Sequence, residues 1–301
     1  MDYKGSAFPR LRYAAPMSAR RPPLPAPPPL SARIIEADAP RPGSGRLRRR
    51  WPDAYRGAMD SAQTPVETPP HLAARALIAE IVPAPAECVD TREELDAELL
   101  AGELEHIARA VPSRRAEFVS GRTCARLALA RLGLGPRPIL AGARGEPKWP
   151  RGIVGSITHC AGYRGAVVAR SAQIASVGID AEPNAALPEG VLDAISLPAE
   201  QAWIERLSTT HQGVSWDRLL FSAKEAVYKA WYPLTLRWLD FVDAAVTVEP
   251  ERGRFTAKLR TGGPVVGGRE VSEFSGRWVV RENLILAAVT VPPRVPNRGG
   301  V

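Results

Sequence analysis

Cysteine is scarce in this sequence, and its pattern argues against a protein stabilised by disulfides or by zinc. There are three cysteines, Cys88, Cys124 and Cys160, an odd number without a Cys-x-x-Cys pair. Such spacing supports neither a disulfide framework nor a zinc site. The chain also lacks an apolar run of about eighteen residues and an apolar N-terminal segment of secretory length. We therefore expect a cytoplasmic protein without a membrane partner.

Positive charge is abundant, but it is confined to the front of the chain. The net charge is +8, and residues 1–58 account for it with 12 Lys and Arg against 4 Asp and Glu. The remaining residues are neutral as a group. Because a nucleic-acid-binding domain carries its basic excess on its folded part, we expect no nucleic-acid partner.

The two ends of the chain have compositions that cannot bury a core. Residues 1–70 hold 14 of the 30 prolines and a basic run at 46–50. We predict a disordered Pro/Arg-rich tail there. The alternative is an over-extended gene start, with translation beginning at Met17 or, because the composition changes soon after it, at Met59. Residues 293–301 are predicted to be a second, flexible tail.

Residues 71–292 carry a globular pattern in which helices precede strands twice. Helices are predicted over 91–109, 113–132, 192–206 and 216–231, with Ser113 as an N-cap and Tyr232-Pro233 as a stop. A hairpin is predicted over 165–170 and 174–181, and later strands over 244–248, 254–258, 276–281 and 284–291. This order predicts an α+β chain of two similar halves, 71–178 and 179–292.

Two carboxylates lie two positions apart in the segment 176–182, whose alternation predicts a strand. Alternate strand residues face opposite sides, so Asp180 and Glu182 share a face. Neighbouring like charges raise each other's pKa, and a hard divalent cation would relieve the repulsion. On this segment alone, the alternative is that the strand ends here and Glu182 is solvated before Pro183.

The segment 221–231 predicts a helix that carries a second set of charges. Glu225 and Lys229 are four residues apart and share a helix face, which an ordinary ion pair would also explain. Three aromatic residues make the helix apolar enough to be buried, and buried Lys and Glu are rare without a partner or a function. A third carboxylate and the ammonium groups of Lys224 and Lys229 would complete a metal–diphosphate site.

Two further features suggest phosphate binding. His159 stands in a Gly-flanked segment at 155–163, where we expect a turn whose backbone N–H groups approach a phosphate. Lone histidines are more often structural, and Cys160 is not expected to act with His159 as a nucleophile pair. Arg114, Arg122 and Arg126 can lie along one side of the helix 113–132. Two of them would form a phosphate clamp, and a solvated face is the alternative.

Together these segments resemble the 4′-phosphopantetheinyl transferases of the surfactin and siderophore-synthetase type. Four family motifs are matched in order, at 145–147 (Gly-x-Pro), 156–159 (histidine motif), 178–182 (metal motif) and 221–231 (Lys-Glu helix). The likeness is strongest to the actinobacterial siderophore-associated branch, through similar stretches at 145–150, 158–163 and 229–231. It covers about residues 72–292. One departure from the family pattern is Ala141. Relatives offer a lysine near the cofactor at this position, and Arg144 would substitute for it.

The resemblance implies a fold and a reaction. The fold would be a pseudo-twofold pair of similar subdomains, each a small antiparallel sheet packed with helices, with coenzyme A in the cleft between them. The enzyme would be a monomer that transfers 4′-phosphopantetheine from coenzyme A to a serine of an apo acyl or peptidyl carrier protein and releases 3′,5′-ADP. Carriers of fatty-acid, polyketide, nonribosomal-peptide and siderophore synthesis all fit.

The resemblance also implies the site residues. Mg²⁺, or Mn²⁺, would be held by Asp180, Glu182, Glu225 and the carbonyl of Ala181 or a water on it. Asp180, Glu225 and Lys229 would be catalytic, with Glu225 as the base. Arg114, Thr158 and His159 would hold the ribose 3′-phosphate, and Lys224 and Lys229 the diphosphate. The full coenzyme A-binding set would be Arg114, Arg122, Arg144, Gly145, Glu146, Pro147, Thr158, His159, Asp180, Lys224, Glu225 and Lys229.

Two other classes of function remain as alternatives. A metal-dependent nuclease also uses Asp, Glu and Lys, but it usually places a lysine two residues after the second carboxylate, where this chain has Asn184. A coenzyme A-binding regulator without activity is the other alternative. The presence of all three carboxylates and both lysines favours an active transferase.

Overall fold

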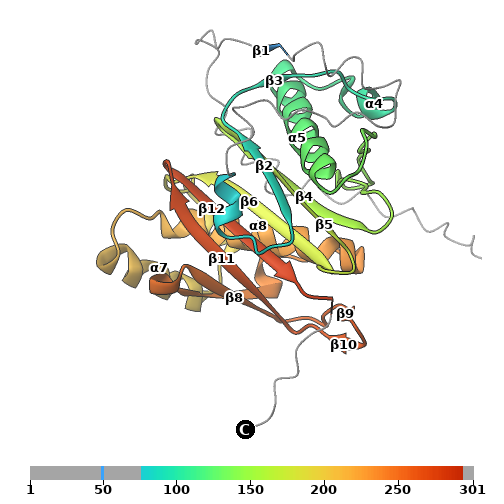
Figure 1. The fold of residues 1–301 in the computed structure, drawn as a ribbon. Coiled ribbons are helices and arrows are strands. Elements are labelled where there is room, and N and C mark those ends of the chain that lie inside the picture. The colour runs from blue at the N-terminus through green and yellow to red at the C-terminus, as the bar shows by residue number, and fades with distance from the viewer. Residues whose placement is uncertain (1–48, 51–75, 294–301) are drawn as a thin grey trace, which may run out of the picture.

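The computed structural model describes residues 49–50 and 76–293 (Figure 1). The predicted tail at 1–70 therefore lies outside the described residues, except for the short strand β1 (Arg49–Arg50). This strand pairs in parallel with β3 (Leu95–Asp96), so these two residues do have regular structure. The predicted tail at 293–301 lies outside the described part from residue 294 onward.

Two antiparallel sheets form the centre of the molecule. The first has the order β2-β5-β4, and the second has the order β6-β12-β11-β8-β7. The strands of the first sheet are β2 (Glu87–Thr91), β4 (Ile153–Cys160) and β5 (Tyr163–Arg170). Those of the second are β6 (Ser176–Pro183), β7 (Ala244–Glu249), β8 (Arg254–Leu259), β11 (Glu273–Arg281) and β12 (Leu284–Val291). A separate hairpin pairs β9 (Val265–Val266) with β10 (Arg269–Glu270).

Each sheet is covered by one helix of 20 residues, α5 (Pro112–Arg131) on the first and α8 (Trp216–Thr235) on the second. The remaining helices are α4 (Glu103–Ile107), α6 (Val191–Ile195), α7 (Pro198–Thr210) and the 3₁₀ turns η1 (Leu77–Glu80), η2 (Phe241–Asp243) and η3 (Pro250–Arg252). A third core lies between the sheets and joins Val167 of β5 to Ile179 of β6 and Leu286 of β12. The layers are therefore helix, sheet, sheet, helix, which confirms the predicted α+β fold of two similar halves (Figure 1).

The two halves meet where the edge strands β4 and β6 lie side by side. Ser156 Oγ accepts a hydrogen bond from Ile179 N–H, and Thr158 Oγ1 accepts one from Ala181 N–H, both at 3.1 Å. Helix α8 crosses β6 at Gly178, where a Cβ would lie 2.0 Å from the carbonyl oxygen of Ala226. Only glycine permits this approach, so α8 can lie directly over the acidic end of β6.

Several predicted elements differ from the structure. The helix predicted over 91–109 is mostly absent, because β2 runs to Thr91 and α4 begins only after Gly102, which adopts a φ of 83°. Residues 155–160 belong to strand β4 and not to a turn. The hairpin predicted over 165–181 is also wrong. Its strands exist, but β5 pairs with β2 and β4, whereas β6 pairs with β12.

Smaller differences concern the helix ends and the boundary between the halves. Val111 rather than Ser113 is the N-cap of α5, since Pro112 fits the first helical turn. Helix α8 continues through Pro233 and ends where Leu236 adopts a left-handed φ of 54°. The predicted boundary after residue 178 falls inside β6, which pairs as one strand from Ser176. In the described part of the chain, no helix is both long and apolar enough to span a bilayer.

Candidate functional site

The acidic end of β6 lies beneath helix α8, and its two carboxylates share one face, as the strand alternation predicts. Asp180 and Glu182 are both buried, at 4% and 8% exposure, and both belong to the face that Gly178 turns toward α8. Ala181 points the other way into the core between the sheets. Its N–H is donated to Thr158 at the outer edge, so its carbonyl also points away from β12.

Asp180 is paired with Lys229 across the seam between β6 and α8. The Lys229 Nζ lies 2.6 Å from Asp180 Oδ1, which also accepts a hydrogen bond from Thr158 Oγ1 at 3.3 Å. Burial by itself would lower the pKa of Lys229, but the charges of Asp180 and Glu225 outweigh it and raise that pKa. The second oxygen, Asp180 Oδ2, is buried and has no hydrogen-bond partner among the described residues. One buried acceptor therefore faces this cluster unsatisfied.

Glu225 and Glu182 complete the group of carboxylates near Asp180. Burial raises the pKa of Glu225, Lys229 opposes the rise, and Asp180 adds to it. Burial and then Asp180 raise the pKa of Glu182, although Arg218 NH1 forms an ion pair with Glu182 Oε2 at 3.0 Å. Arg218 is a partner that the sequence analysis missed, because nothing in its spacing connects it with β6.

The predicted three-carboxylate metal cluster is not formed in this conformation. Among residues 76–293, no three acidic, histidine or cysteine side chains are arranged to hold a metal ion. The reason is visible in the partners, since Lys229 occupies one oxygen of Asp180 and Arg218 holds Glu182. The donor set still fits a hard cation, because Asp180 Oδ2 is unsatisfied and the charge of Asp180 raises the pKa of both Glu182 and Glu225.

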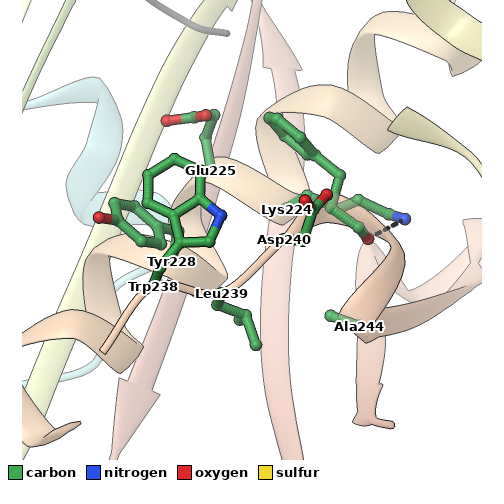
Figure 2. A pocket seen from close by; sticks show the side chains of 8 residues that line it. Lys224, Glu225, Tyr228, Trp238, Leu239, Asp240 and Ala244 are labelled. Carbon is green, nitrogen blue, oxygen red and sulfur yellow. Dashed lines mark hydrogen bonds between the residues drawn. The ribbon is translucent and has the colours of Figure 1, made fainter. Parts of the chain in front are cut away.

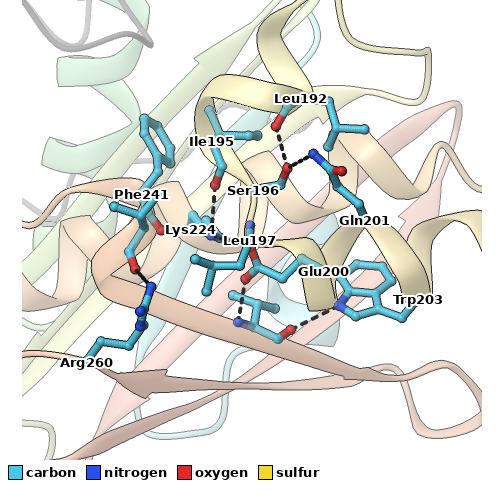
Figure 3. A network of polar contacts seen from close by, with 12 residues as sticks. Leu192, Ile195, Ser196, Leu197, Glu200, Gln201, Trp203, Lys224, Phe241 and Arg260 are labelled. Atoms are coloured by element: carbon cyan, nitrogen blue, oxygen red, sulfur yellow. Dashed lines mark hydrogen bonds and ion pairs between the residues drawn. The ribbon is translucent and has the colours of Figure 1, made fainter.

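Lys224 lies away from this cluster, which does not support its predicted contact with a diphosphate. Its ammonium donates to Glu200 Oε2, the carbonyl of Ile195 and the carbonyl of Phe241 at 2.7–2.8 Å (Figure 3). These three bonds use all three N–H groups of a lysine. Glu200 in turn accepts from the backbone N–H groups of Leu197 and Val246. Lys224 is therefore part of a buried network that joins α6, α7, α8 and β7.

A second charged group lies on the opposite side of β4. The Arg114 guanidinium is 2.6 Å from His159 Nε2, and Glu117 Oε2 is 3.4 Å from Arg114 NH1. Because a guanidinium only donates, Nε2 accepts and the neutral ring carries its proton on Nδ1. That Nδ1 is buried without a hydrogen-bond partner among the described residues. Burial, followed by the charge of Arg114, lowers the pKa of His159 to about 3.

The structure brings some of the predicted phosphate-binding residues together and separates others. Thr158 neighbours His159 in β4 but points to Asp180, since adjacent strand residues face opposite ways. Arg122 is buried, donates from Nε to the carbonyl of Ile139 and lies over the ring of Phe118. Arg126 forms a buried pair with Glu103, so it has a structural partner and is not part of a clamp.

The segment at 141–147 forms a tight hairpin-like loop. Ala141 and Pro147 form an antiparallel bridge, and Glu146 Oε2 accepts a hydrogen bond from the N–H of Arg144 at 2.9 Å. Gly145 has a φ of 83°, a left-handed conformation that suits glycine. The Arg144 guanidinium lies 5.5 Å from the ring centre of Trp238, so the loop of one half reaches the other half.

A pocket opens beside Glu225 in the C-terminal half. It is lined by Lys224, Glu225, Tyr228, Trp238, Leu239, Asp240, Phe241 and Ala244. Figure 2 shows Trp238 and Tyr228 packed together next to Glu225, with Leu239 nearby. The lining is mostly apolar, with Glu225 at one end. The sequence analysis did not identify Trp238 or Leu239, because they follow the helix in an irregular segment without periodicity.

Comparisons with known proteins agree with this arrangement. Residues 102–169 match the 4′-phosphopantetheinyl transferase N-terminal domain, and residues 176–282 match the 4′-phosphopantetheinyl transferase superfamily. The 4′-phosphopantetheinyl transferase Svp of Streptomyces mobaraensis is 57% identical over 193 residues, which cover 64% of this chain and 78% of the relative. PptT of Mycobacterium tuberculosis is 54% identical over 189 residues (62% and 82%), and Npt of Nocardia iowensis is 48% identical over 224 residues (71% and 99%).

Proposed function

Because the chain belongs to the 4′-phosphopantetheinyl transferase superfamily, with its closely similar relatives among the actinobacteria, we propose specific roles for the residues of its two charged clusters. The protein is an enzyme that transfers phosphopantetheine to carrier proteins, and coenzyme A is its co-substrate. The nuclease alternative has no support from these comparisons. What remains to be assigned is how this chain binds coenzyme A and moves the proton of the acceptor serine.

We propose that coenzyme A lies across the seam between β4 and β6. Its 3′-phosphate would bind Arg114 and His159, with Arg122 and the backbone of 145–147 around the nucleotide. Arg144 and Glu146 would line the same side of the nucleotide as the 145–147 backbone. Its diphosphate would lie at Lys229. The support is geometric, because the Arg114–His159 pair and the Asp180–Lys229 pair lie on either side of β4.

A divalent cation, Mg²⁺ or Mn²⁺, would be held by Asp180 and Glu225, with Glu182 and the carbonyl of Ala181 beside them on β6. When bound, it would supply positive charge against the diphosphate oxygens. The observation that supports this is the buried and unsatisfied Asp180 Oδ2. Lys224 is left out of the diphosphate site because its three donors are used elsewhere.

The proposed reaction is an in-line displacement at phosphorus. The hydroxyl oxygen of the carrier serine forms a bond to the β-phosphorus, the bond from that phosphorus to the bridging oxygen breaks, and 3′,5′-ADP leaves with the electron pair. Glu225 takes the serine proton, directly or through a water, since its raised pKa suits a general base. Lys229 stabilises the charge that develops on the phosphate oxygens.

The observation that carries the proposal is the Asp180–Lys229 pair beside Glu225, in a chain that belongs to the 4′-phosphopantetheinyl transferase superfamily. The test is mass spectrometry of an apo carrier protein incubated with the full chain, coenzyme A and Mg²⁺. We expect a mass gain equal to one phosphopantetheine, and no gain with Asp180→Asn, with Glu225→Gln or after chelation. Glu189→Gln, at an exposed carboxylate, is the control. Normal transfer by either site variant would reject the assigned roles, and no transfer by the unchanged protein would support a coenzyme A-binding regulator.

A further inference from the structure

Arg164 is a buried guanidinium near the N-terminal start of β5, the central strand of the first sheet. It is 6% exposed. Its Nε is fully buried without a hydrogen-bond partner among the described residues. An arginine stays charged in proteins, and a buried N–H of a charged group that lacks an acceptor is costly. A buried group of this kind is typical of a site where the side chain binds an external ligand.

The neighbours of Arg164 point to the kind of ligand. His159 of β4 lies directly opposite Arg164 in the antiparallel register, so both side chains occupy the same face of the sheet. That face is covered by α5, since Ala166 and Ile157 pack with it in one core. Arg114 of α5 contacts the same histidine at 2.6 Å. The guanidinium of Arg114 therefore contacts the imidazole, and Arg164 is the residue paired opposite His159 on the same face of the sheet.

The charge around this histidine is unbalanced toward positive. Glu117 is the acidic group in contact, 3.5 Å from His159 Nδ1 and 3.4 Å from Arg114. The pKa of His159 is lowered by burial and then by the positive charges of Arg114, Lys229, Arg164 and Arg122. Lys229 is balanced by Asp180, but Glu117 is one carboxylate against three arginines, and a dianion such as a phosphomonoester would offset that excess.

We propose that Arg164 binds the terminal phosphomonoester of coenzyme A together with Arg114 and His159, and that it sets the preference for coenzyme A over dephospho-coenzyme A. This inference rests on the proposed placement of the 3′-phosphate. A guanidinium suits the role because its fork of N–H donors matches phosphate oxygens. It also explains why an arginine with an unsatisfied N–H is kept inside a central strand. In the free enzyme it destabilises the fold, and with the nucleotide bound it has an anion.

The experiment measures KM and kcat for coenzyme A and for dephospho-coenzyme A, with an apo carrier protein as acceptor. For Arg164→Met we expect the KM for coenzyme A to rise roughly 10- to 100-fold, the loss of a charge-assisted bond to phosphate, with kcat little changed. The KM for dephospho-coenzyme A should stay the same. Arg164→Lys should recover part of the preference. Arg170→Met, at the exposed end of the same strand, is the matched control and should behave like the unchanged enzyme.

Thermal unfolding of the free enzyme separates binding from a structural role. We expect Arg164→Met to unfold at the same or a higher temperature than the unchanged enzyme, and to gain less stability from added coenzyme A. The inference would be overturned, in favour of a structural role, if the variant lost stability and its KM rose by the same factor for coenzyme A and for dephospho-coenzyme A. If Arg164→Met does not fold, Arg164→Gln replaces it. The ratio of its KM for coenzyme A to its KM for dephospho-coenzyme A then decides the question in the same way. No preference for coenzyme A in the unchanged enzyme would instead reject the proposed phosphate site itself.

Discussion

The ammonium of Lys229 lies 2.6 Å from Asp180 Oδ1, so that helix α8 is tied to β6, the edge strand of the second sheet that lies beside β4. Asp180 also contacts Thr158 of the first half. A single carboxylate therefore connects α8, β6 and β4. This places the charges of the site at the junction of the two sheets, where a ligand that spans both halves can reach them.

Removal of Lys229 should affect the reaction more than the fold. Lys229→Met leaves Asp180 and Glu225 buried without their cation, so the pKa of Glu225 should rise further. We expect the transfer rate to fall roughly 100-fold or more, as for loss of one charge-stabilising donor, and the pH–rate profile to move to higher pH. Steady-state kinetics from about pH 6 to 9 measure both, with Lys258→Met at an exposed position as the control. An unshifted profile would contradict the proposed coupling.

The Lys224–Glu200 pair should be a determinant of stability. Both side chains are 2% exposed and lie 2.7 Å apart, and removal of one partner leaves a buried charge (Figure 3). We expect Lys224→Met to lower the free energy of unfolding by roughly 3–5 kcal/mol. Glu200→Gln should also destabilise, and the double variant should lose clearly less than the sum of the two. Urea unfolding of the four proteins measures the coupling, and additive losses would show that the two side chains act independently.

Gly178 should tolerate no side chain. A Cβ at this position would lie 2.0 Å from the carbonyl oxygen of Ala226 and 2.6 Å from the backbone N of Ala230. Gly178→Ala must therefore push α8 away from β6, with a loss of stability of roughly 1–3 kcal/mol or more. Since that shift separates Lys229 from Asp180, activity should fall as well. Gly135→Ala has open space around its Cβ and is the control. Equal unfolding midpoints for the two variants would contradict the close packing.

The stability of the free enzyme should depend on the ionisation of His159. The pKa of His159 is lowered to about 3 in the folded protein, whereas an unfolded histidine titrates near pH 6.5. Between these values the unfolded chain binds a proton that the folded one refuses. The contribution of His159 to the free energy of unfolding is therefore fully present above about pH 6.5. It falls by roughly 1.4 kcal/mol for each pH unit below that value. His159→Asn should lack this part of the slope in unfolding experiments between pH 7 and 4.5. Parallel curves for the two proteins would show that His159 accepts a proton in the fold.

The sequence by itself determined the long elements and the local spacing of the charges. Apolar periodicity located α5, α8 and the strands of the second sheet to within a few residues. The period of a strand placed Asp180 and Glu182 on one face, and the family resemblance was confirmed by relatives at 48–57% identity. These properties depend on residues near one another in the chain, which is why the pattern was sufficient.

Only the tertiary structure decided which charges are paired with which. Lys224 and Lys229 have the same chemistry and lie on one helix, yet one is bound by Glu200 of α7 and the other by Asp180 of β6. The strands β5 and β6 are neighbours in sequence but belong to different sheets, because β5 pairs with the preceding β4 and the distant β2, whereas β6 pairs with the distant β12. Partners such as Arg218 for Glu182, and the absence of a partner for Arg164 Nε among the described residues, arise from packing across long separations. Local periodicity carries no information about such contacts.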